Sequence, residues 1–463
     1  MNKDTMIYKI KTDVEKVLKR KDKATIPSAL IDEEGHVVGF MEQAALLTHH
    51  LHLLRYRDDF HSTYADKADA VLQLWTDCLM SIENEWEING TETLKKLILD
   101  DMESKPFYVA HNSPRFLFID LFAGIGGFRM ALQNEGGVCV FSSEFDDNAQ
   151  MTYYQNYGEI PFGDITLDRI KSYIPNHFDI LCGGFPCQPF SICGRKKGFD
   201  DTRGTLFFDV CQILDRHKPK VCFLENVQHL TKHDHGNTFM VIVESLINLG
   251  YNVSNRILNS KDFGLPQFRE RIFIVGSRNG LFSFNSIKKS PIVSMENFLD
   301  KDGEFEYLKK GEYTILPANL VKVQMKSGLK FIGYRNKGQW KKGVRPNTEY
   351  LSRVHRQPNR IYSVEGTHPT LPSQETSGRF WIYIPWEDSV RKLTINECYR
   401  FMGYPTNFVK HDSLGTQYKQ LGNSVAIPVI SVIIKAILKQ ELLTNNIKDE
   451  DVRGHTEQLT FDF

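Results

Sequence analysis

The chain has 463 residues, of which 57 are Lys or Arg and 57 are Asp or Glu, so its formal net charge is zero. This length is sufficient for one large core plus one or two smaller units, and the composition excludes a low-complexity chain. Eight cysteines without disulfide-like or Cys-x-x-Cys spacing argue against a disulfide framework and against zinc fingers. No apolar run approaches the ~20 residues that span a bilayer, and no signal-peptide region follows the charged start. We therefore expect a cytoplasmic protein without a membrane partner.

Residues 1–113 are predicted to form a helical extension that ends in a linker. An apolar stripe recurs there at helical spacing, at Val71, Trp75, Leu79, Ile82 and Trp86. The polar, proline-containing stretch 104–114 is typical of a linker. The three neighbouring histidines are expected on a solvated helix rather than in a metal site, and they are His49, His50 and His52.

From residue 114 the pattern changes to alternating strands and helices. Short apolar runs predict buried strands at 116–121, 138–141, 180–182, 221–224 and 272–275. Helices are expected between them, for example at 206–215 and 239–249. This alternation is typical of an α/β fold with a doubly wound, mixed and mostly parallel sheet. We assign residues 114–278 to this lobe.

Residues 279–390 lose that rhythm and are predicted to form a smaller, irregular, β-leaning domain. Thirteen Lys and Arg but only three acids lie between residues 305 and 360. Such a basic segment on a neutral chain indicates an anionic partner, although a solvated, loop-rich surface would have the same composition. Residues 391–440 are expected to add helices, near 396–402 and 426–438, that complete the first lobe, and 441–463 form a polar tail.

A glycine turn between the first strand and its helix predicts a nucleotide-type cofactor site. Phe122, Gly124, Gly126 and Gly127 belong to this turn, and Glu144 follows Gly124 by twenty residues, at the end of the next strand. A doubly wound nucleotide site places a ribose-binding acid at that position. The third glycine of the dinucleotide pattern is missing, so a purely structural turn remains an alternative.

Two further segments extend this prediction. Asp164, with Ile165 beside it, could present a carboxylate to an adenine amino group, but an ordinary turn or helix-cap acid fits equally well. Pro186 and Pro189 enclose Cys187 directly after a buried strand. Because loops at the carboxyl ends of parallel strands point into the ligand crevice, Cys187 is a candidate nucleophile.

The next strands supply candidate partners for that thiol. Glu225 ends the strand 221–224 and is expected to face the same crevice, unless it only caps a helix. Strand alternation should send Arg269 and Arg271 to one face, where two guanidinium groups favour phosphate or carboxylate.

Six motifs in one order resemble the DNA (cytosine-5) methyltransferases of bacterial restriction-modification systems. They are Phe-Ala-Gly-Ile-Gly-Gly, Pro-Cys-Gln-Pro, Glu-Asn-Val, Gln-x-Arg-x-Arg, Arg-Phe-Met-Gly-Tyr-Pro and Gln-Leu-Gly-Asn-Ser-Val, and they span roughly residues 115–440. The resemblance implies S-adenosylmethionine as cofactor, converted to S-adenosylhomocysteine. It assigns cofactor contacts to Phe122, Gly124, Gly126, Gly127, Glu144, Phe145, Asp164, Ile165, Pro186, Asn423, Ser424 and Val425.

The resemblance also implies a mechanism and a second lobe. Cys187 would add to C6 of a cytosine flipped out of duplex DNA, Glu225 would engage N3, and Arg269 and Arg271 would support the site. Segment 279–390 would be the target-recognition domain. Expected DNA contacts are Gln188, Ser191, Arg195 and Lys196 in the cysteine loop and Thr370 and Leu371 in a Thr-Leu element. The implied partner is double-stranded DNA, bound by a monomer without a metal, with a separate cognate endonuclease acting on the same site.

Three alternatives stay open from sequence. An RNA cytosine-5 methyltransferase would use the same catalytic logic. A DNA-binding regulator could act through the N-terminal helices, either without catalysis or in addition to it. A nicotinamide oxidoreductase would explain the glycine turn but not Pro186-Cys187. The extension itself is expected either to contact flanking DNA or regulate transcription, or simply to pack against the catalytic lobe.

Overall fold

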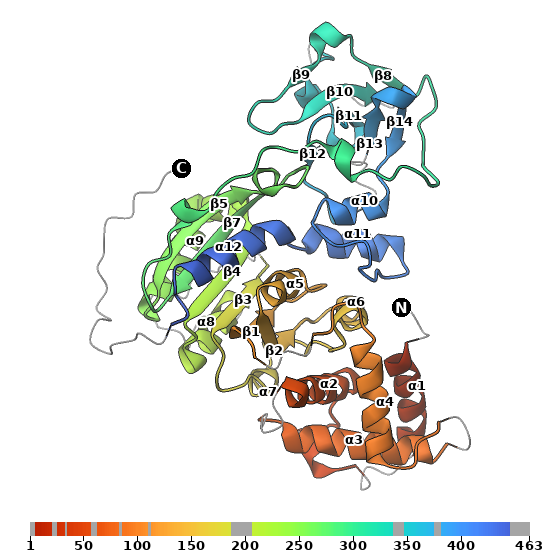
Figure 1. Cartoon of the computed structure of the whole chain (residues 1–463), viewed down its shortest axis with the longest axis vertical. Helices are drawn as coiled ribbons and strands as arrows, with labels where there is room; N and C mark the ends of the chain where they lie inside the picture. Colours follow the sequence, from red (N-terminus) through yellow and green to blue (C-terminus); the bar gives the residue numbers. More distant parts are fainter. Residues whose placement is uncertain are drawn as a thin grey trace. The chain divides into compact units, whose positions relative to one another are not determined.

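The computed structural model of the chain describes most of its length (Figure 1). The described residues are 5–20, 26–32, 35–56, 63–82, 86–109, 113–186, 206–336, 347–374 and 381–444. They fall into two compact units. The first comprises Met1–Arg256, Ile272–Ser286 and Ile433–Phe463, and the second comprises Ile257–Arg271 and Ile287–Val432.

The first unit begins with a helical extension. Its helices are α1 (Met6–Leu18), η2 (Ser28–Leu30), α2 (Phe40–Tyr56), α3 (Ala65–Met80) and α4 (Thr91–Glu103). The predicted apolar stripe is confirmed for Val71, Trp75 and Leu79, which are buried on α3. It is wrong for Ile82 and Trp86, which lie beyond the end of that helix and are half-buried. The Trp75 ring stacks on Phe40 of α2 with ring centroids 4.6 Å apart. Packing between α2 and α3 therefore stabilises both helices, because most helical stability in proteins comes from tertiary packing.

A six-stranded sheet follows, in the order β2-β1-β3-β4-β7-β5. Its strands are β1 (Phe116–Leu121), β2 (Gly137–Ser143), β3 (Ile180–Gly184), β4 (Val221–Val227), β5 (Asn252–Asn259) and β7 (Glu270–Ser277). β1 is parallel to both β2 and β3, and β3 is parallel to β4. The expected doubly wound α/β fold is confirmed. Since the chain goes from β1 to β2 on one side and then to β3 on the other, the strand order reverses between β1 and β3, which is where such sheets bind ligands.

Helices flank this sheet (Figure 1). They are α5 (Gly127–Asn134), α6 (Asp147–Tyr157), α7 (Asp168–Lys171), α8 (Leu206–His217), η5 (Gln228–Gly236) and α9 (Asn237–Asn248). The predicted helices at 206–215 and 239–249 correspond to α8 and α9. The Asp146 side chain caps α6 by accepting from the backbone N–H groups of Asn148 and Ala149, and Gly158 ends the helix in a left-handed conformation.

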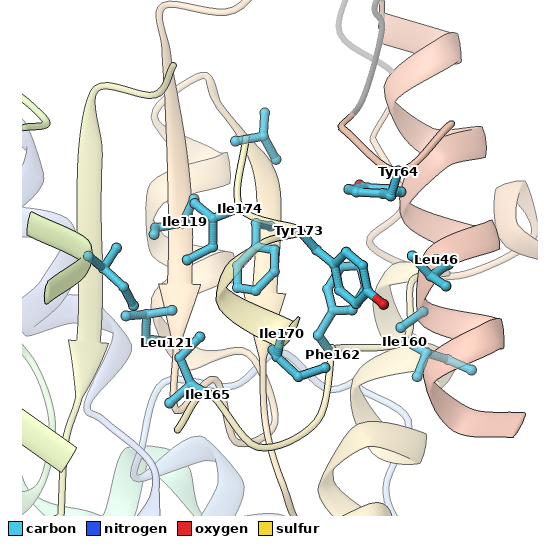
Figure 2. Packing of buried hydrophobic residues seen from close by; sticks show 14 of the residues in the cluster. Leu46, Tyr64, Ile119, Leu121, Ile160, Phe162, Ile165, Ile170, Tyr173 and Ile174 are labelled. Carbon is cyan, nitrogen blue, oxygen red and sulfur yellow. The ribbon is translucent and has the colours of Figure 1, made fainter. Parts of the chain in front are cut away.

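The extension and the sheet lobe share one apolar core. Figure 2 shows Leu46 and Tyr64 of the extension beside Ile160, Phe162 and Tyr173 of the sheet lobe. The Tyr64 ring meets the Phe162 ring edge-on with centroids 5.6 Å apart. The expectation that the extension packs against the catalytic lobe is thus confirmed.

The expectation that the three neighbouring histidines lie on a solvated helix is wrong. His49, His50 and His52 are all buried, because α2 lies between the other helices of the extension and the sheet lobe. His49 Nε2 lies 3.2 Å from Ser142 Oγ of β2, and its ring packs on Phe162 at 4.8 Å. Their spacing gave no sign of this burial, because the Ser142 hydroxyl and the Glu159 carboxylate, which His49 and His52 face, lie more than ninety positions away in the chain.

The second unit contains a smaller sheet in the order β14-β13-β11-β10-β8, with β9 paired to β10. Its strands are β8 (Tyr313–Ile315), β9 (Lys322–Val323), β10 (Lys330–Arg335), β11 (Arg360–Ser363), β13 (Trp381–Ile384) and β14 (Ser389–Lys392), and β6 (Gln267–Phe268) pairs with β12 (His368–Pro369) apart from it. Ile361, Trp381 and Val390 form a separate small core. The predicted irregular, β-leaning character of this region is confirmed.

Short 3-10 helices link these strands, and three α-helices follow them. The short helices are η6 (Ser260–Phe263), η7 (Phe284–Ser286), η8 (Met295–Phe298), η9 (Ala318–Leu320), η10 (Ser352–Val354), η11 (Gln357–Asn359) and η13 (Pro385–Glu387). The α-helices are α10 (Ile395–Arg400), α11 (Leu414–Asn423) and α12 (Ile427–Lys439). Thr394 and Glu397 form a reciprocal capping box that fixes the start of α10. The predicted helices near 396–402 and 426–438 correspond to α10 and α12.

One stretch of the described chain, Leu414–Lys439, is long and apolar enough by composition to cross a membrane. Of its most apolar window, 56% is buried inside the structure. Ile430, Ile433, Ile434 and Ile437 are fully buried. This burial is typical of a core helix.

Candidate active site

The turn after β1 has the backbone that its glycines predict. Gly124 and Gly126 adopt positive φ values of 55° and 82°, and Phe122 is also left-handed at 54°. A Cβ at Gly126 would lie 2.3 Å from the Tyr157 ring, so only glycine fits there. A Cβ at Gly124 would meet nothing within 4 Å. The turn is therefore fixed on its Gly126 side and open beside Gly124, as a ligand cradle requires.

Glu144 at the end of β2 is joined to this turn. Its Oε2 accepts from the backbone N–H of Gly124 at 2.8 Å, and its Oε1 accepts from the N–H of Asp146 at 2.9 Å. Burial raises the pKa of the Glu144 carboxyl, although the N–H groups of Asp146 and Gly124 act in the opposite direction. A carboxylate has about four acceptor directions, so Glu144 can still bind a hydroxyl group such as one of a ribose. The spacing correctly predicted that the acid lies beside the turn, and the binding of a cofactor by the two stays a prediction.

The other predicted cofactor contacts have different environments. Phe145 is 78% exposed, directly after Glu144, and an exposed ring there is available to stack on a flat ligand. Asp164 is exposed and its Oδ1 accepts from the Thr166 N–H at 2.9 Å, so a turn-forming role is confirmed. Ile165 is buried in the core. Contacts of these three residues with a cofactor remain predictions.

The nucleophile loop begins at the next strand. Cys187, Gln188, Ser191, Arg195 and Lys196 lie outside the described residues. The strand that leads to them is β3, which ends at Gly184 and is followed by buried Phe185 and exposed Pro186.

Glu225 lies beside the start of that loop. It pairs with Gly184 in the parallel register of β3 and β4, and its side chain is buried. The neighbouring Asn226 donates through Nδ2 to the Phe185 carbonyl at 2.8 Å. The chain therefore leaves β3 toward Cys187 from a point fixed next to Glu225.

The described cysteines are all buried. Burial raises the pKa of Cys139 to about 12, and it raises the pKa of Cys182 well above the ordinary value. Such thiols stay protonated and are poor nucleophiles. In the part of the chain that the structure describes, no group of His, Cys, Asp and Glu could hold a metal ion.

Arg269 and Arg271 differ in their surroundings. Arg269 is buried, and its Nη2 donates to the carbonyls of Gly422 and Ser424 at 3.0 and 2.5 Å. Arg271 is half-buried and its Nη1 donates to the Glu270 carbonyl. Within the second unit, Arg269 thus holds the segment that contains Asn423, Ser424 and Val425. Sequence reasoning assigned both arginines to the reacting centre and did not foresee this backbone contact.

The Thr-Leu element is fixed against β6 within the same unit. Thr370 Oγ1 donates to the Phe268 carbonyl at 2.8 Å, and the Leu371 N–H donates to Gln267 Oε1 at 3.0 Å. Gln267 also donates to the Phe401 carbonyl. The described contacts of Thr370 and Leu371 are therefore internal to the protein, and their contact with DNA remains a prediction.

Sequence reasoning missed a charged cluster beside the cofactor turn. Arg129 of α5 and Glu159 are both fully buried and form an ion pair with an N–O distance of 2.6 Å. His52 Nδ1 and His49 Nε2 of α2 lie 3.3 and 3.7 Å from the same carboxylate. The available signal was Arg129, a charged residue beside the apolar Phe128 and Met130 on the helix directly after the glycine turn.

Comparison with known proteins agrees with this arrangement. The sequence model of the C-5 cytosine-specific DNA methylases matches residues 116–439. The chain is 43% identical over 334 residues to the Type II methyltransferase M.HpaII of Haemophilus parainfluenzae, covering 70% of this chain and 90% of that protein. It is 40% identical over 324 residues to M.HhaI of Haemophilus parahaemolyticus, covering 68% and 92%.

A solved structure, the S. pombe Dnmt2 methyltransferase, shares the fold. It superposes with a TM-score of 0.50 at 18% identity, covering 70% of this chain and 99% of that one. The family match extends over both the glycine turn and the cysteine motif, from β1 to the end of α12. The chain therefore belongs to the C-5 cytosine-specific DNA methylases.

Proposed function

We propose a residue-level mechanism for the sequence-specific DNA cytosine-5 methylation that this chain, as a member of that family, carries out. The observation that carries it is that the glycine turn and the end of β3 lie on either side of the point where the strand order reverses. The glycine turn, bonded to Glu144, follows β1, and Gly184, at the end of β3 and three residues before Cys187, pairs with Glu225. Parallel neighbouring strands bring their carboxyl ends to one edge, so the cofactor and the nucleophile meet there.

The cofactor site fits S-adenosylmethionine, which supplies a methyl group on a positively charged sulfur when bound. Glu144 would accept from the ribose hydroxyls while the open side of Gly124 admits the ligand close to the backbone. Phe145 would stack on the adenine, and Asp164 would accept from its amino group. Asn423, Ser424 and Val425 are proposed as further contacts of the cofactor.

Cytosine C5 is a weak nucleophile, so the protein must activate the ring. The Cys187 thiolate adds to C6, and Glu225 shares a proton with N3 as negative charge develops there. Held at the glycine turn beside Glu144, S-adenosylmethionine would supply the methyl group that C5 takes up, and the donor sulfur would leave as a neutral thioether. Loss of the C5 proton to a base and elimination of the thiolate restore the aromatic ring. The pyrimidine must leave the duplex stack for this chemistry, at a cost of about a few kcal/mol.

The remaining contacts would hold the duplex. Gln188, Ser191, Arg195 and Lys196 would contact the flipped nucleotide and its phosphates, and the second unit would read base edges. Arg271 is half-buried and would stabilise charge near the ring. We further propose that the enzyme acts as a cytoplasmic monomer that protects host DNA from a separate endonuclease, since its relatives are named Type II methyltransferases.

Trapping of the covalent intermediate tests the nucleophile. Duplex DNA that carries 5-fluorocytosine at the target blocks loss of the C5 substituent, so the wild-type protein should form a stable adduct that maps to Cys187. The Cys187→Ser variant should bind DNA, form no adduct and lose nearly all turnover. An adduct on another residue, or near-normal turnover by Cys187→Ser, would contradict the proposed mechanism.

Two companion experiments define the substrate. Labelled methyl transfer should be found with duplex DNA and not with transfer RNA, because the family model that matches the chain is that of the C-5 cytosine-specific DNA methylases. Digestion of methylated plasmid with methylation-sensitive restriction enzymes then identifies the target sequence.

A transcriptional role of the extension remains a prediction. Deleting the extension would open the shared core, so substitution of Lys9, Lys16 and Lys19, exposed on or directly after α1, is the cleaner test. Unchanged DNA affinity and expression control in the triple Lys→Gln variant would argue against that role.

A further inference from the structure

Tyr157, the last residue of α6, holds the glycine turn from inside the protein. Its side chain is fully buried, and its hydroxyl donates to the Gly126 carbonyl at 2.8 Å. The same carbonyl accepts the Met130 N–H at 2.9 Å, the first hydrogen bond of α5. The Tyr157 ring also occupies the space that a Cβ at Gly126 would need. One side chain therefore fixes both the carbonyl direction and the left-handed backbone of the turn.

The Tyr157 ring has little freedom of its own. Its centroid lies 4.7 Å from that of Tyr153 and 6.2 Å from that of Phe107, and the Arg129 guanidinium lies 5.4 Å from it. Phe107 comes from the segment after α4, at the end of the extension. Its carbonyl accepts from Gln133 Nε2 of α5 at 2.8 Å. The extension thus touches both the tyrosine and the helix that the turn begins.

The rest of α6 is also fastened to the extension. The Phe107 N–H donates to the Asn156 carbonyl at 2.9 Å, and the Tyr154 hydroxyl donates to Asp101 of α4. A Cβ at Gly158 would lie 2.8 Å from the Met102 carbonyl, so α4 and the end of α6 are in direct backbone contact. A displacement of α4 would therefore displace Tyr157.

We propose that Tyr157 is a positioning residue for cofactor binding and that the N-terminal extension acts on the cofactor turn through it. The inference rests on the proposed assignment of S-adenosylmethionine to that turn. Tyr157 contacts no reacting atom. Its hydroxyl keeps the turn in the shape that the cofactor binds, so the free protein does not spend binding energy to form it.

Tyr157→Phe tests this role, because it removes only the hydroxyl. Titration calorimetry of the full-length protein with S-adenosylmethionine, without DNA, should show a Kd about fivefold higher than wild type, as expected for one lost hydrogen bond. The KM for the cofactor should rise by a similar factor, while kcat and the KM for DNA stay within twofold. Tyr153→Phe is the matched control. It lies one turn earlier, is equally buried and contacts Arg129 rather than the turn, so its cofactor Kd should not change.

Tyr154→Phe tests the connection to the extension. It removes the hydrogen bond to Asp101 at a distance from the turn, and it should raise the cofactor Kd about twofold to threefold with unchanged KM for DNA. If Tyr154→Phe has the wild-type Kd while Tyr157→Phe does not, the extension has no part in positioning and that half of the proposal fails.

The outcomes separate this inference from the function on which it rests. The positioning role is overturned if Tyr157→Phe has the wild-type cofactor Kd. It is also overturned if Tyr157→Phe weakens the binding of cofactor and the binding of DNA equally, and by no more than Tyr153→Phe does. If Glu144→Ala binds the cofactor as tightly as wild type, the assigned cofactor site itself is wrong, and the inference falls with it.

Discussion

The buried cluster around Glu159 gives a prediction with a large expected effect. Glu159→Gln keeps the side-chain shape but removes the negative charge that faces Arg129 at 2.6 Å. Both side chains are at most 1% exposed, so water cannot replace the lost partner. Leaving one charge buried without its counterion costs about 3–5 kcal/mol. That is a large part of the ~5–15 kcal/mol by which a folded domain is stable.

Hydrogen exchange measured by mass spectrometry can locate this loss. Amides of α2 and α6 should exchange faster in Glu159→Gln, because His49 and His52 of α2 face the same carboxylate. Protection in β10 and β11 of the second unit should not change. Glu397→Gln is the matched control, since its carboxylate pairs with the buried Arg391 at 2.7 Å in the second unit. In Glu397→Gln, amides of β10 and β11 should exchange faster, and protection in α2 and α6 should not change.

A double variant separates charge from packing. Arg129→Met combined with Glu159→Leu removes both charges and keeps apolar volume, so it should cost less free energy of unfolding than Glu159→Gln alone. The reasoning would be refuted if Glu159→Gln costs less than about 1 kcal/mol, or if the double variant is less stable than the single one.

Further predictions follow from single contacts. Burial lowers the pKa of His49 to about 4; Arg129 and His52 lower it further, and Glu159 opposes the shift. As the pH drops from about 6.5 to 4, the unfolded state therefore binds a proton before the folded state does, and the free energy of unfolding falls. Thermal melts of His49→Gln should show a smaller loss of stability over that pH range. Arg269→Met should speed amide exchange at 422–425, because Ser424 loses its guanidinium partner; unchanged exchange would mean that this bond is dispensable. Gly183→Ala places a Cβ 2.5 Å from the Leu121 carbonyl, so it should destabilise by about 1–3 kcal/mol in denaturant unfolding, and a neutral result would show that β1 and β3 can separate.

The sequence predicted the central strands well because their environment is uniform. The apolar runs at 116–121 and 221–224 lie on strands buried almost throughout, so hydrophobicity alone marks them. The pairing of Glu144 with the glycine turn was also predictable, because the fold fixes both at strand ends. By contrast, β5 was missed, since its exposed Asn252 and Arg256 interrupt any apolar pattern.

The contacts that join the extension to the site could not be read from the sequence. His49 meets Glu159 across more than one hundred residues, and Tyr157 meets Gly126 across thirty-one. Such contacts depend on how helices pack, and neither composition nor periodicity encodes the partner. The same is true of Arg269, whose acceptors are backbone carbonyls that any sequence would supply.

The division of the chain into interleaved units has a consequence for its synthesis. The first unit also includes Ile272–Ser286 and a segment that begins at Ile433, and the ribosome makes the latter segment only after the whole second unit. Roughly 180 residues separate Arg256 from Ile433. At ~5–20 residues per second, the ribosome therefore reaches Ile433 about 10 to 35 s after Arg256. Until then, the apolar surface that Ile433, Ile434 and Ile437 finally cover faces water. A nascent chain of this design is a natural client for a chaperone that shields exposed apolar surface during translation.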